Sequence, residues 1–395
     1  MADDHVMVEK SRSSAGYPKN LRFYADVLLR ALFLLIVFNL LYAALSPGPL
    51  LARISAYNLL FPGRLRLPYG ENPERDYNMS LSSLEAMFAS HEISGKPKSA
   101  SEFRVVLIGD SSIWGFLLPP EQTLAAYINE AEIELPDGRA VHAYNLGYPV
   151  MSLAKDLLIL SEAMAYDPDL IIWPVTLESF PEDKQLSHPL LQQNPDKVRA
   201  LNEKYLLDLD VQSPGQIQAP FLNDTIIGSR RSLADLLRLQ LYGVMWAATG
   251  IDHEIPEVYI PRQEDLPADT NFHNIPGPAF NTSDLAFDLL FTGQRIAGQV
   301  PVILVNEPIF LSQGRNSHIR YNFFYPRWAY DDYRQHLSTL SRENVWVYID
   351  LWDAVDKDQF TNSAIHMTPE GTRQFARLLI ESIIEIAGSS APALE

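Results

Sequence analysis

Short apolar runs alternate with longer segments of helical periodicity from residue 103 to the C-terminal region. The apolar runs are 103–108, 141–146, 169–175, 300–305 and 345–350, and the helical patterns cover 121–133, 152–166, 282–298, 327–342 and 368–387. Strands that are apolar on both faces and separated by helices are typical of a parallel sheet covered on both sides. The pattern therefore predicts an α/β fold, a three-layer α/β/α sandwich with a parallel sheet, over residues 101–390.

About 120 residues between the third and fourth predicted strands do not follow this alternation. Residues 180–280 are polar and contain scattered prolines, so we expect an insertion in the sandwich. One amphipathic helix is predicted within it, over 230–250. Its apolar positions are Leu233, Leu236, Leu237, Leu241 and Val244. The pattern leaves open whether this helix packs as a cap on the domain or faces a membrane or a partner protein.

A hydrophobic segment near the N-terminus is long enough to cross a membrane. Residues 27–45 are apolar except for Arg30 and Asn39, and such a helix is about 28 Å long. The basic residues Lys10, Arg12, Lys19, Arg22 and Arg30 all lie towards its N-terminal side. By the positive-inside rule we expect that side in the cytoplasm. A cleaved signal peptide or a buried core helix are the alternatives.

These observations predict the membrane topology of the whole chain. Residues 1–22 form a cytoplasmic N-terminus, 23–46 a single-pass anchor in the lipid bilayer of the cell membrane, and 47–100 a stem or linker. The domain of residues 101–390 then lies outside the cytoplasm.

Composition excludes several classes of function. The net charge of −18 repels nucleic acid, so no nucleic-acid partner is expected. The absence of cysteine excludes disulfides, thiolate zinc sites and cysteine nucleophiles. Neither a metal-ligand spacing nor a phosphate-binding loop occurs, so we expect no metal and no cofactor.

The first predicted strand stops at the polar turn Gly109-Asp110-Ser111-Ser112. A serine on a sharp strand-to-helix turn projects above the sheet edge, where it can act as a nucleophile. His366 lies after the last predicted strand, just before the last helix. Because the ends of parallel strands meet at one edge of the sheet, we expect Ser111 and His366 to lie close together there.

Four segments carry a resemblance to a known family. GDSS, YNLGYPVMS, PDLIIWPVTLESF and FTNSAIHMTPEG resemble, in order and spacing over residues 103–387, the blocks of the SGNH (GDSL) hydrolase superfamily. The resemblance implies that Ser111 is the nucleophile and His366 the base. It also implies that the backbone N–H groups of Ser111 and Gly147 form an oxyanion hole.

The anchored, exported setting is similar to the branch of that superfamily that moves acyl groups on cell-envelope polymers. Alginate O-acetylation and teichoic acid D-alanylation proteins are examples. This similarity implies a glycan or acyl-ester substrate and a membrane partner, such as an integral-membrane acyltransferase.

Two positions depart from the family pattern. The usual third block contributes an Asn to the oxyanion hole, whereas this chain has Thr176 in that stretch. The usual acid three residues before the histidine is Ser363 here, and the nearest amide is Asn362. We expect Thr176, Asp110 and Asn362 to line the site, with Asn362 able to orient the imidazole.

Other carboxylates are candidates for the site. Asp350, Asp353 and Asp356 lie upstream of the histidine and are alternative acids. Glu307 ends the fourth strand at the same sheet edge, where it could line the pocket, although we expect a solvated loop carboxylate.

Two functions follow from these features. The first is an esterase or O-acyltransferase that uses Ser111 and His366 on an envelope glycan or lipid. The second is an SGNH fold without catalysis, serving as a subunit or glycan-binding module of a membrane assembly.

Overall fold

The structure is a computed structural model of the chain. It describes residues 21–61, 63–69, 83–95, 97–207, 209, 221–249, 260–281 and 283–389. The chain divides into two compact units. Unit 1 contains Met1–Ser46 and Phe221–Ser229, and unit 2 contains Pro47–Pro220 and Arg230–Glu395.

Unit 2 is built on one sheet of five parallel strands in the order β2-β1-β3-β4-β5. The strands are β1 (Glu102–Leu107), β2 (Ala140–Asn145), β3 (Leu170–Val175), β4 (Val302–Asn306) and β5 (Val347–Asp350). They coincide with the five predicted runs to within two residues. Leu107 pairs with Asn145, and Val175 pairs with Asn306, so the carboxyl ends of neighbouring strands meet at one edge.

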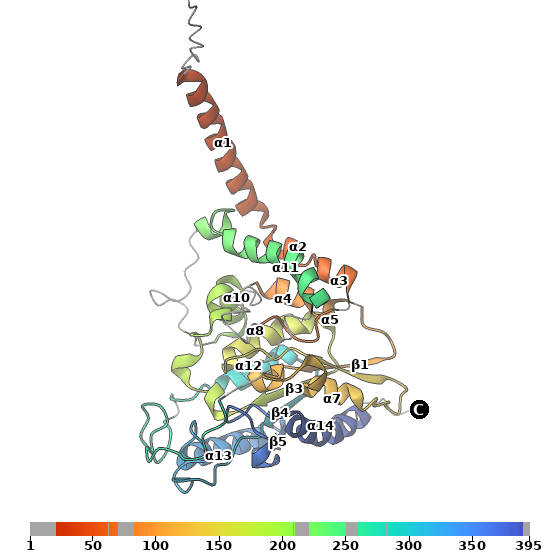
Figure 1. Cartoon of the computed structure of the whole chain (residues 1–395), viewed down its shortest axis with the longest axis vertical. Helices are drawn as coiled ribbons and strands as arrows, with labels where there is room; N and C mark the ends of the chain where they lie inside the picture. Colours follow the sequence, from red (N-terminus) through yellow and green to blue (C-terminus); the bar gives the residue numbers. More distant parts are fainter. Residues whose placement is uncertain are drawn as a thin grey trace, which may run out of the picture. The chain divides into compact units, whose positions relative to one another are not determined.

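Helices cover both faces of this sheet, as Figure 1 shows. One face carries α8 (Leu153–Ala163), α12 (Asp288–Ala297) and α13 (Arg327–Glu343), and the other carries α7 (Leu124–Glu130) and α14 (Pro369–Ser389). Side chains of β1 alternate between the two cores, because Val106 packs in the first and Val105 in the second. The predicted three-layer α/β/α sandwich is confirmed.

The segment expected to be a stem packs in part against the sandwich. It forms α2 (Gly48–Ala52), α3 (Ala56–Leu60), α4 (Leu84–Ser90) and α5 (Glu92–Gly95). Leu84, Met87 and Phe88 recur at helical spacing and are completely buried in the first core. Residues 84–95 therefore belong to the domain and are not a free linker. Residues 70–82 of the expected stem lie outside the described residues.

The insertion contains α9 (Pro189–Gln193), α10 (Pro195–Tyr205) and α11 (Arg230–Thr249). The amphipathic helix predicted over 230–250 is thus confirmed as α11. Its Gln240 side chain accepts from the Ala56 amide at 2.6 Å and donates to the Ile54 carbonyl at 2.8 Å, which fastens α11 to α3. Residues 210–220 and 250–259 lie outside the described residues.

Unit 1 contains α1 (Leu21–Leu45) and the short turn η5 (Phe221–Asp224). Within α1, Phe23–Leu45 has a mean hydropathy of 2.3 and only 6% of its most apolar window is buried. Among the described helices it is the one long and apolar enough to cross a membrane. Asn39, its polar interruption, donates from its amide to the Leu35 carbonyl at 2.7 Å and accepts from the Ile227 amide at 3.2 Å, so both ends of its carboxamide are paired within unit 1.

Candidate active site

The nucleophile turn follows β1 directly. Gly109 has a φ of +148°, and a Cβ there would lie 2.7 Å from the side chain of Ile113, so both conformation and space favour glycine. Asp110 caps the short helix α6 (Ser111–Trp114), because its Oδ1 accepts from the Ser112 amide at 2.8 Å. The chain reverses sharply here and presents the Ser111 hydroxyl at the sheet edge.

Three side chains form a continuous hydrogen-bonded line. The Oγ of Ser111 lies 2.8 Å from Nε2 of His366, and Nδ1 of His366 lies 2.8 Å from Oδ1 of Asn362. A carbonyl oxygen only accepts, so Nδ1 carries the proton and Nε2 is free to accept from the serine. The Ser111 and His366 pairing expected from the strand ends is therefore present in the structure.

The imidazole of His366 is held in an apolar environment. The ring of Phe116 stacks on it at a centroid distance of 4.7 Å, and His366 is partly buried. Desolvation lowers the pKa of His366 to about 4. The ring is consequently neutral at pH 7, the state in which it can accept a proton.

The groups expected to form an oxyanion hole are not all free to do so. Among the described residues the Ser111 N–H has no hydrogen-bond partner. The Gly147 N–H donates to Oδ1 of Asn145 at 3.1 Å. The hydroxyl of Thr176 is completely buried and pairs with the Tyr325 hydroxyl at 3.0 Å.

Gly147 has a further constraint, on its Cα. A Cβ there would lie 2.5 Å from the Trp114 amide nitrogen, so the β2 turn packs directly on the nucleophile helix. The Asn145 side chain reinforces this packing, donating to the Ile113 carbonyl at 2.8 Å.

A buried carboxyl group lies behind the nucleophile turn. Glu307, expected to be solvated, is completely buried; its carboxyl group accepts a hydrogen bond from the Ser112 hydroxyl and is also hydrogen-bonded to Asp110. Burial, followed by the charge of Asp110, raises the pKa of Glu307 well above its usual range. The expectation of a solvated carboxylate was wrong because the sequence places Glu307 at the end of a strand but does not show which side chains pack around it.

A buried lysine joins the same turn to the next one. Nζ of Lys155 donates to the Gly109 carbonyl at 2.6 Å and to the Tyr148 carbonyl at 2.8 Å, and it pairs with Asp156 at 2.6 Å. Lys155 is fully buried. The only sequence signal for it is a charged pair within the otherwise apolar start of α8.

The loop that carries His366 is braced by the insertion. The backbone amide of Arg262 donates to the Thr361 carbonyl at 2.8 Å, and its Nη1 donates to the Phe360 carbonyl at 2.6 Å. Asp350, weighed as an alternative acid, instead bonds the Asn306 amide at 2.8 Å and pairs with Arg334 at 2.6 Å. The group oriented toward Nδ1 is therefore Asn362.

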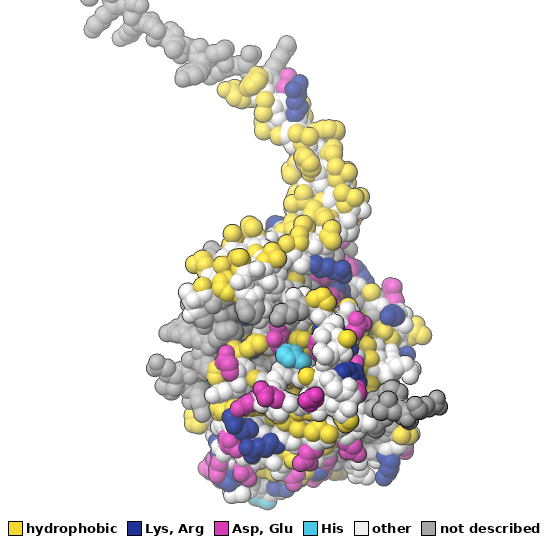
Figure 2. Space-filling model, turned by 90° about the vertical axis from the view of Figure 1, so that its right-hand side faces the viewer, with side chains coloured by type: hydrophobic (Ala, Val, Ile, Leu, Met, Phe, Trp, Pro, Cys, Tyr) yellow, Lys and Arg dark blue, Asp and Glu magenta, His cyan; other side chains and the backbone are white. Residues whose placement is uncertain are grey.

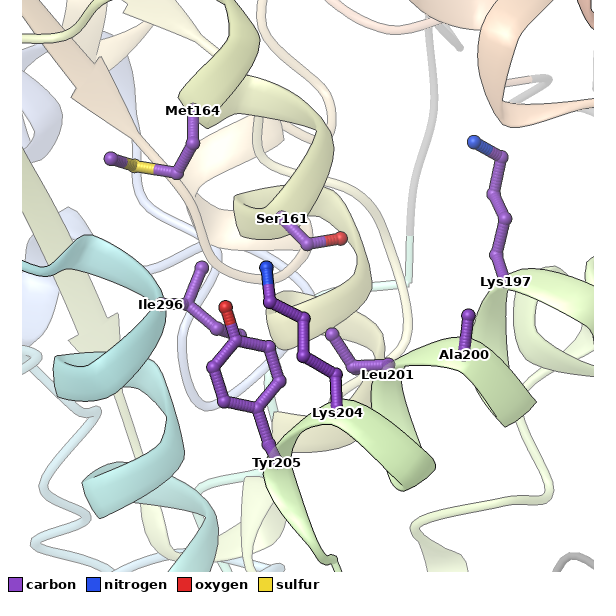
Figure 3. Close-up of a pocket in the computed structure, with 8 residues that line it drawn as sticks. All are labelled: Ser161, Met164, Lys197, Ala200, Leu201, Lys204, Tyr205 and Ile296. Carbon is purple, nitrogen blue, oxygen red and sulfur yellow. The ribbon is translucent and has the colours of Figure 1, made fainter.

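Away from this line, the described residues offer a cavity but no cluster of three or more side chains suited to a metal ion. A cavity of about 280 Å³ lies among α8, α10 and α12, and Figure 3 shows the side chains that line it. It is lined by Ser161, Met164, Lys197, Ala200, Leu201, Lys204, Tyr205 and Ile296. Lys197 is already paired there with Glu85 and Glu162, each at 2.9 Å.

Comparisons with known proteins add distant likenesses only. No protein-family model matches the sequence, and no curated protein matches it. A carbohydrate acetylesterase family member from Sinorhizobium meliloti is 13% identical, with 72% of this chain and 99% of that chain covered and a TM-score of 0.31. A lipolytic protein of the G-D-S-L family from Veillonella parvula is 11% identical, with coverages of 70% and 96% and a TM-score of 0.34.

An aryl esterase from M. smegmatis is similar to the same degree. It is 12% identical, with coverages of 71% and 98% and a TM-score of 0.33. Likenesses of this degree decide neither the family nor the activity of this chain.

Proposed function

We propose that the chain is a membrane-anchored esterase or O-acyltransferase of the SGNH type, acting through a Ser111 acyl-enzyme. The observation that supports this proposal is the hydrogen-bonded line from Ser111 through His366 to Asn362. A serine hydroxyl is a weak nucleophile at its own pKa, and a neutral imidazole at hydrogen-bond distance is the group that activates it.

The reaction proceeds in two half-reactions. Oγ of Ser111 attacks the ester carbonyl carbon while Nε2 of His366 takes the hydroxyl proton. The imidazolium returns that proton to the leaving alcohol as the ester bond breaks, which leaves an acyl group on Ser111. Water or an acceptor hydroxyl then gives its proton to Nε2 of His366 and attacks the acyl carbon. The imidazolium returns that proton to Oγ of Ser111 as the bond between Oγ and the acyl carbon breaks, which restores the free serine and the neutral histidine.

Asn362 holds the imidazole without adding charge. It fixes the tautomer that presents an unprotonated Nε2 to Ser111, but it stabilises the transient imidazolium less than a carboxylate would. The Ser111 N–H is the donor best placed for the oxyanion, since it belongs to the attacking residue and is unpaired among the described residues. A slow enzyme is the expected outcome.

The setting supports a substrate of the cell envelope. If α1 is an uncleaved anchor with its basic N-terminal side in the cytoplasm, unit 2 faces the outside of the cell membrane. Glycans and lipids carrying ester groups are the substrates within its reach there. An integral-membrane acyltransferase is the partner that would supply acyl groups.

A fluorophosphonate probe tests the proposal on the full-length chain in detergent. We expect wild type to be labelled and Ser111→Ala to lose the label completely. Ser112→Ala is the matched control, because its hydroxyl is turned towards Glu307, and it should keep the label. Absence of label in a wild-type chain that melts cooperatively would contradict the proposal that Ser111 is a catalytic nucleophile.

A second function is supported because two expected oxyanion donors are already hydrogen-bonded to other groups. The Gly147 N–H and the Thr176 hydroxyl, both expected at the oxyanion hole, are engaged by Asn145 and Tyr325. Losing one such donor lowers the rate by about 10²–10³-fold. A catalytically inactive subunit or glycan-binding module fits that arrangement, and it predicts no labelling of Ser111 in any variant.

A further inference from the structure

Two segments at one end of unit 2 expose apolar side chains that the fold does not cover. Eight of the sixteen large hydrophobic residues exposed in the described part of unit 2 lie in α2–α3 (48–60) and α11. They are Leu50, Leu51, Ile54, Leu59, Leu60, Leu237, Leu241 and Met245. We call these eight residues the apolar platform. Such a concentration marks an interaction surface, whereas single exposed leucines need no explanation.

The outer face of α11 shows that this exposure is patterned. Leu237, Leu241 and Met245 follow one another at intervals of four residues and are 59%, 60% and 58% exposed. The opposite side of the helix is already packed, since Gly243 is buried and Gln240 bonds to α3. A surface helix normally turns polar residues outward. The outward stripe of α11 is apolar instead.

The platform is firmly attached to the domain. The amide of Asn58 in α3 donates to the Ala89 carbonyl at 2.6 Å, which joins α3 to the end of α4. Gln240 joins α11 to α3 through both of its amide atoms. Figure 1 shows α2, α3 and α11 side by side at one end of unit 2 and α13 at the other. The platform thus moves with the sandwich as one surface.

Chain connectivity indicates what covers the platform. Only Ser46 and Pro47 separate the end of α1 from the start of α2, a reach of about 11 Å whatever the direction of α1. Beyond the hydrocarbon core, a bilayer extends about 5–8 Å on each side as headgroups. If α1 spans the membrane, α2 begins within or beside that layer.

Charge points to the same partner. Residues 48–60 and 230–249 together carry four arginines (Arg53, Arg230, Arg231 and Arg238) and one acid, Asp235, in a chain of net charge −18. A basic, apolar surface on an acidic protein suits the anionic headgroup layer of a membrane. Figure 2 shows hydrophobic side chains gathered over one end of the globular part, whereas the rest of the visible face mixes charged, hydrophobic and other side chains.

We propose that the apolar platform of α2, α3 and α11 inserts into the headgroup region of an anionic lipid bilayer. This inference rests on the proposed anchor but not on the proposed catalysis. The contact holds unit 2 against the membrane surface and leaves it little freedom to swing on its two-residue connection to α1.

Single-cysteine labelling of the full-length chain tests this, and the natural absence of cysteine makes each label unique. Leu241→Cys and Leu59→Cys report the platform. Val345→Cys, 89% exposed after α13, is the control away from it, and Leu35→Cys reports the anchor. Each variant carries a fluorophore and is reconstituted in vesicles of phosphatidylcholine and phosphatidylglycerol, with or without a spin-labelled quencher lipid.

We expect the quencher lipid to reduce the emission at positions 241, 59 and 35 by at least half and to leave position 345 unchanged. Quenching at position 35 but not at positions 241 and 59 would contradict insertion of the apolar platform while supporting α1 as a membrane anchor. No quenching at 35 overturns the anchor itself. If the labels at positions 241 and 59 are shielded from both the lipid quencher and aqueous iodide, the platform contacts a protein and not the bilayer, which contradicts the proposal.

Discussion

Asn362 determines how basic His366 can become during the proposed reaction. Its carboxamide oxygen orients the ring from 2.8 Å but contributes no charge to stabilise an imidazolium. In Asn362→Asp, a carboxylate in the same place favours the charged ring. We expect labelling of Ser111 by the fluorophosphonate to become about tenfold faster, equivalent to about 1.4 kcal/mol of barrier.

The pH dependence of labelling checks the same substitution. Wild-type labelling requires the neutral ring, so it should persist at pH 5 and fall as the pH drops through about 4, the pKa of His366. In Asn362→Asp this fall should occur at higher pH, because the carboxylate raises the pKa. Asn362→Ala is the matched control, because it removes the orienting oxygen without adding a charge, and it should not label faster than wild type.

Glu307 gives a prediction about stability. The pKa of its carboxyl group is higher in the folded state than in the unfolded state. The neutral carboxyl group therefore stabilises the fold at pH values below its unfolded-state pKa, and this stabilisation is lost as the pH rises through its folded-state pKa. Wild type should therefore lose thermal stability between pH 5 and pH 9. Glu307→Gln stays neutral and should lose less, as measured by the melting temperature across that range.

A second variant separates charge from packing at this position. Glu307→Ala leaves the Ser112 hydroxyl and the Asp110 carboxylate without their partner, which costs about 1–3 kcal/mol at pH 5 and less as the pH rises. Equal melting temperatures for wild type and Glu307→Ala at pH 5 would contradict the buried carboxyl cluster.

Some residues of the candidate site could be predicted from the sequence and others could not, for physical reasons. Ser111 and His366 could be predicted because strand ends converge and because a polar turn after an apolar strand stands out in the sequence. Glu307 and Lys155 could not, since their burial depends on contacts between segments distant in sequence. Thr176 could be aligned with a family block, but nothing in the sequence indicated its partner Tyr325.

Among the elements, the insertion supports the loop of His366 through Arg262. Its guanidinium and backbone amide donate to the carbonyls of Phe360 and Thr361. Arg262→Met removes the side-chain contact and should slow Ser111 labelling by about tenfold, because small displacements of a catalytic group are costly. Single-turnover labelling at saturating probe should show the loss in the rate constant and not in probe affinity.

An arginine that follows β4 and pairs with the insertion supplies the control for this effect. Arg315 is highly exposed and pairs with Asp265 at 3.6 Å, away from the loop of His366. Arg315→Met should label as fast as wild type. Equal labelling rates for Arg262→Met and Arg315→Met would show that the Arg262 side chain does not influence the position of His366.

The five strands and the α11 helix were predictable because their hydrophobic period is set locally. The packing of the stem was not. Leu84, Met87 and Phe88 show a helical period, but the prolines and polar residues around them resemble a linker, and only the complete fold shows the core surface that they cover.

At the scale of the whole molecule, the proposed anchor predicts which side of the membrane the domain occupies. We expect protease added to spheroplasts to digest unit 2 and to spare a tag fused before Met1, because the basic residues retain the N-terminus in the cytoplasm. Immunoblotting with antibodies to the tag and to the domain reads out both. Digestion of the tag with survival of the domain would reverse the orientation.

Ser111 and His366 are separated by 255 positions, although their side chains touch. The ribosome therefore delivers the nucleophile long before the base, and the chain that emerges first has a serine turn but no group to activate it. If the domain is threaded through a translocation channel, the proposed site comes together only after nearly the whole polypeptide has crossed. Reactivity is thereby deferred until the protein has reached its destination.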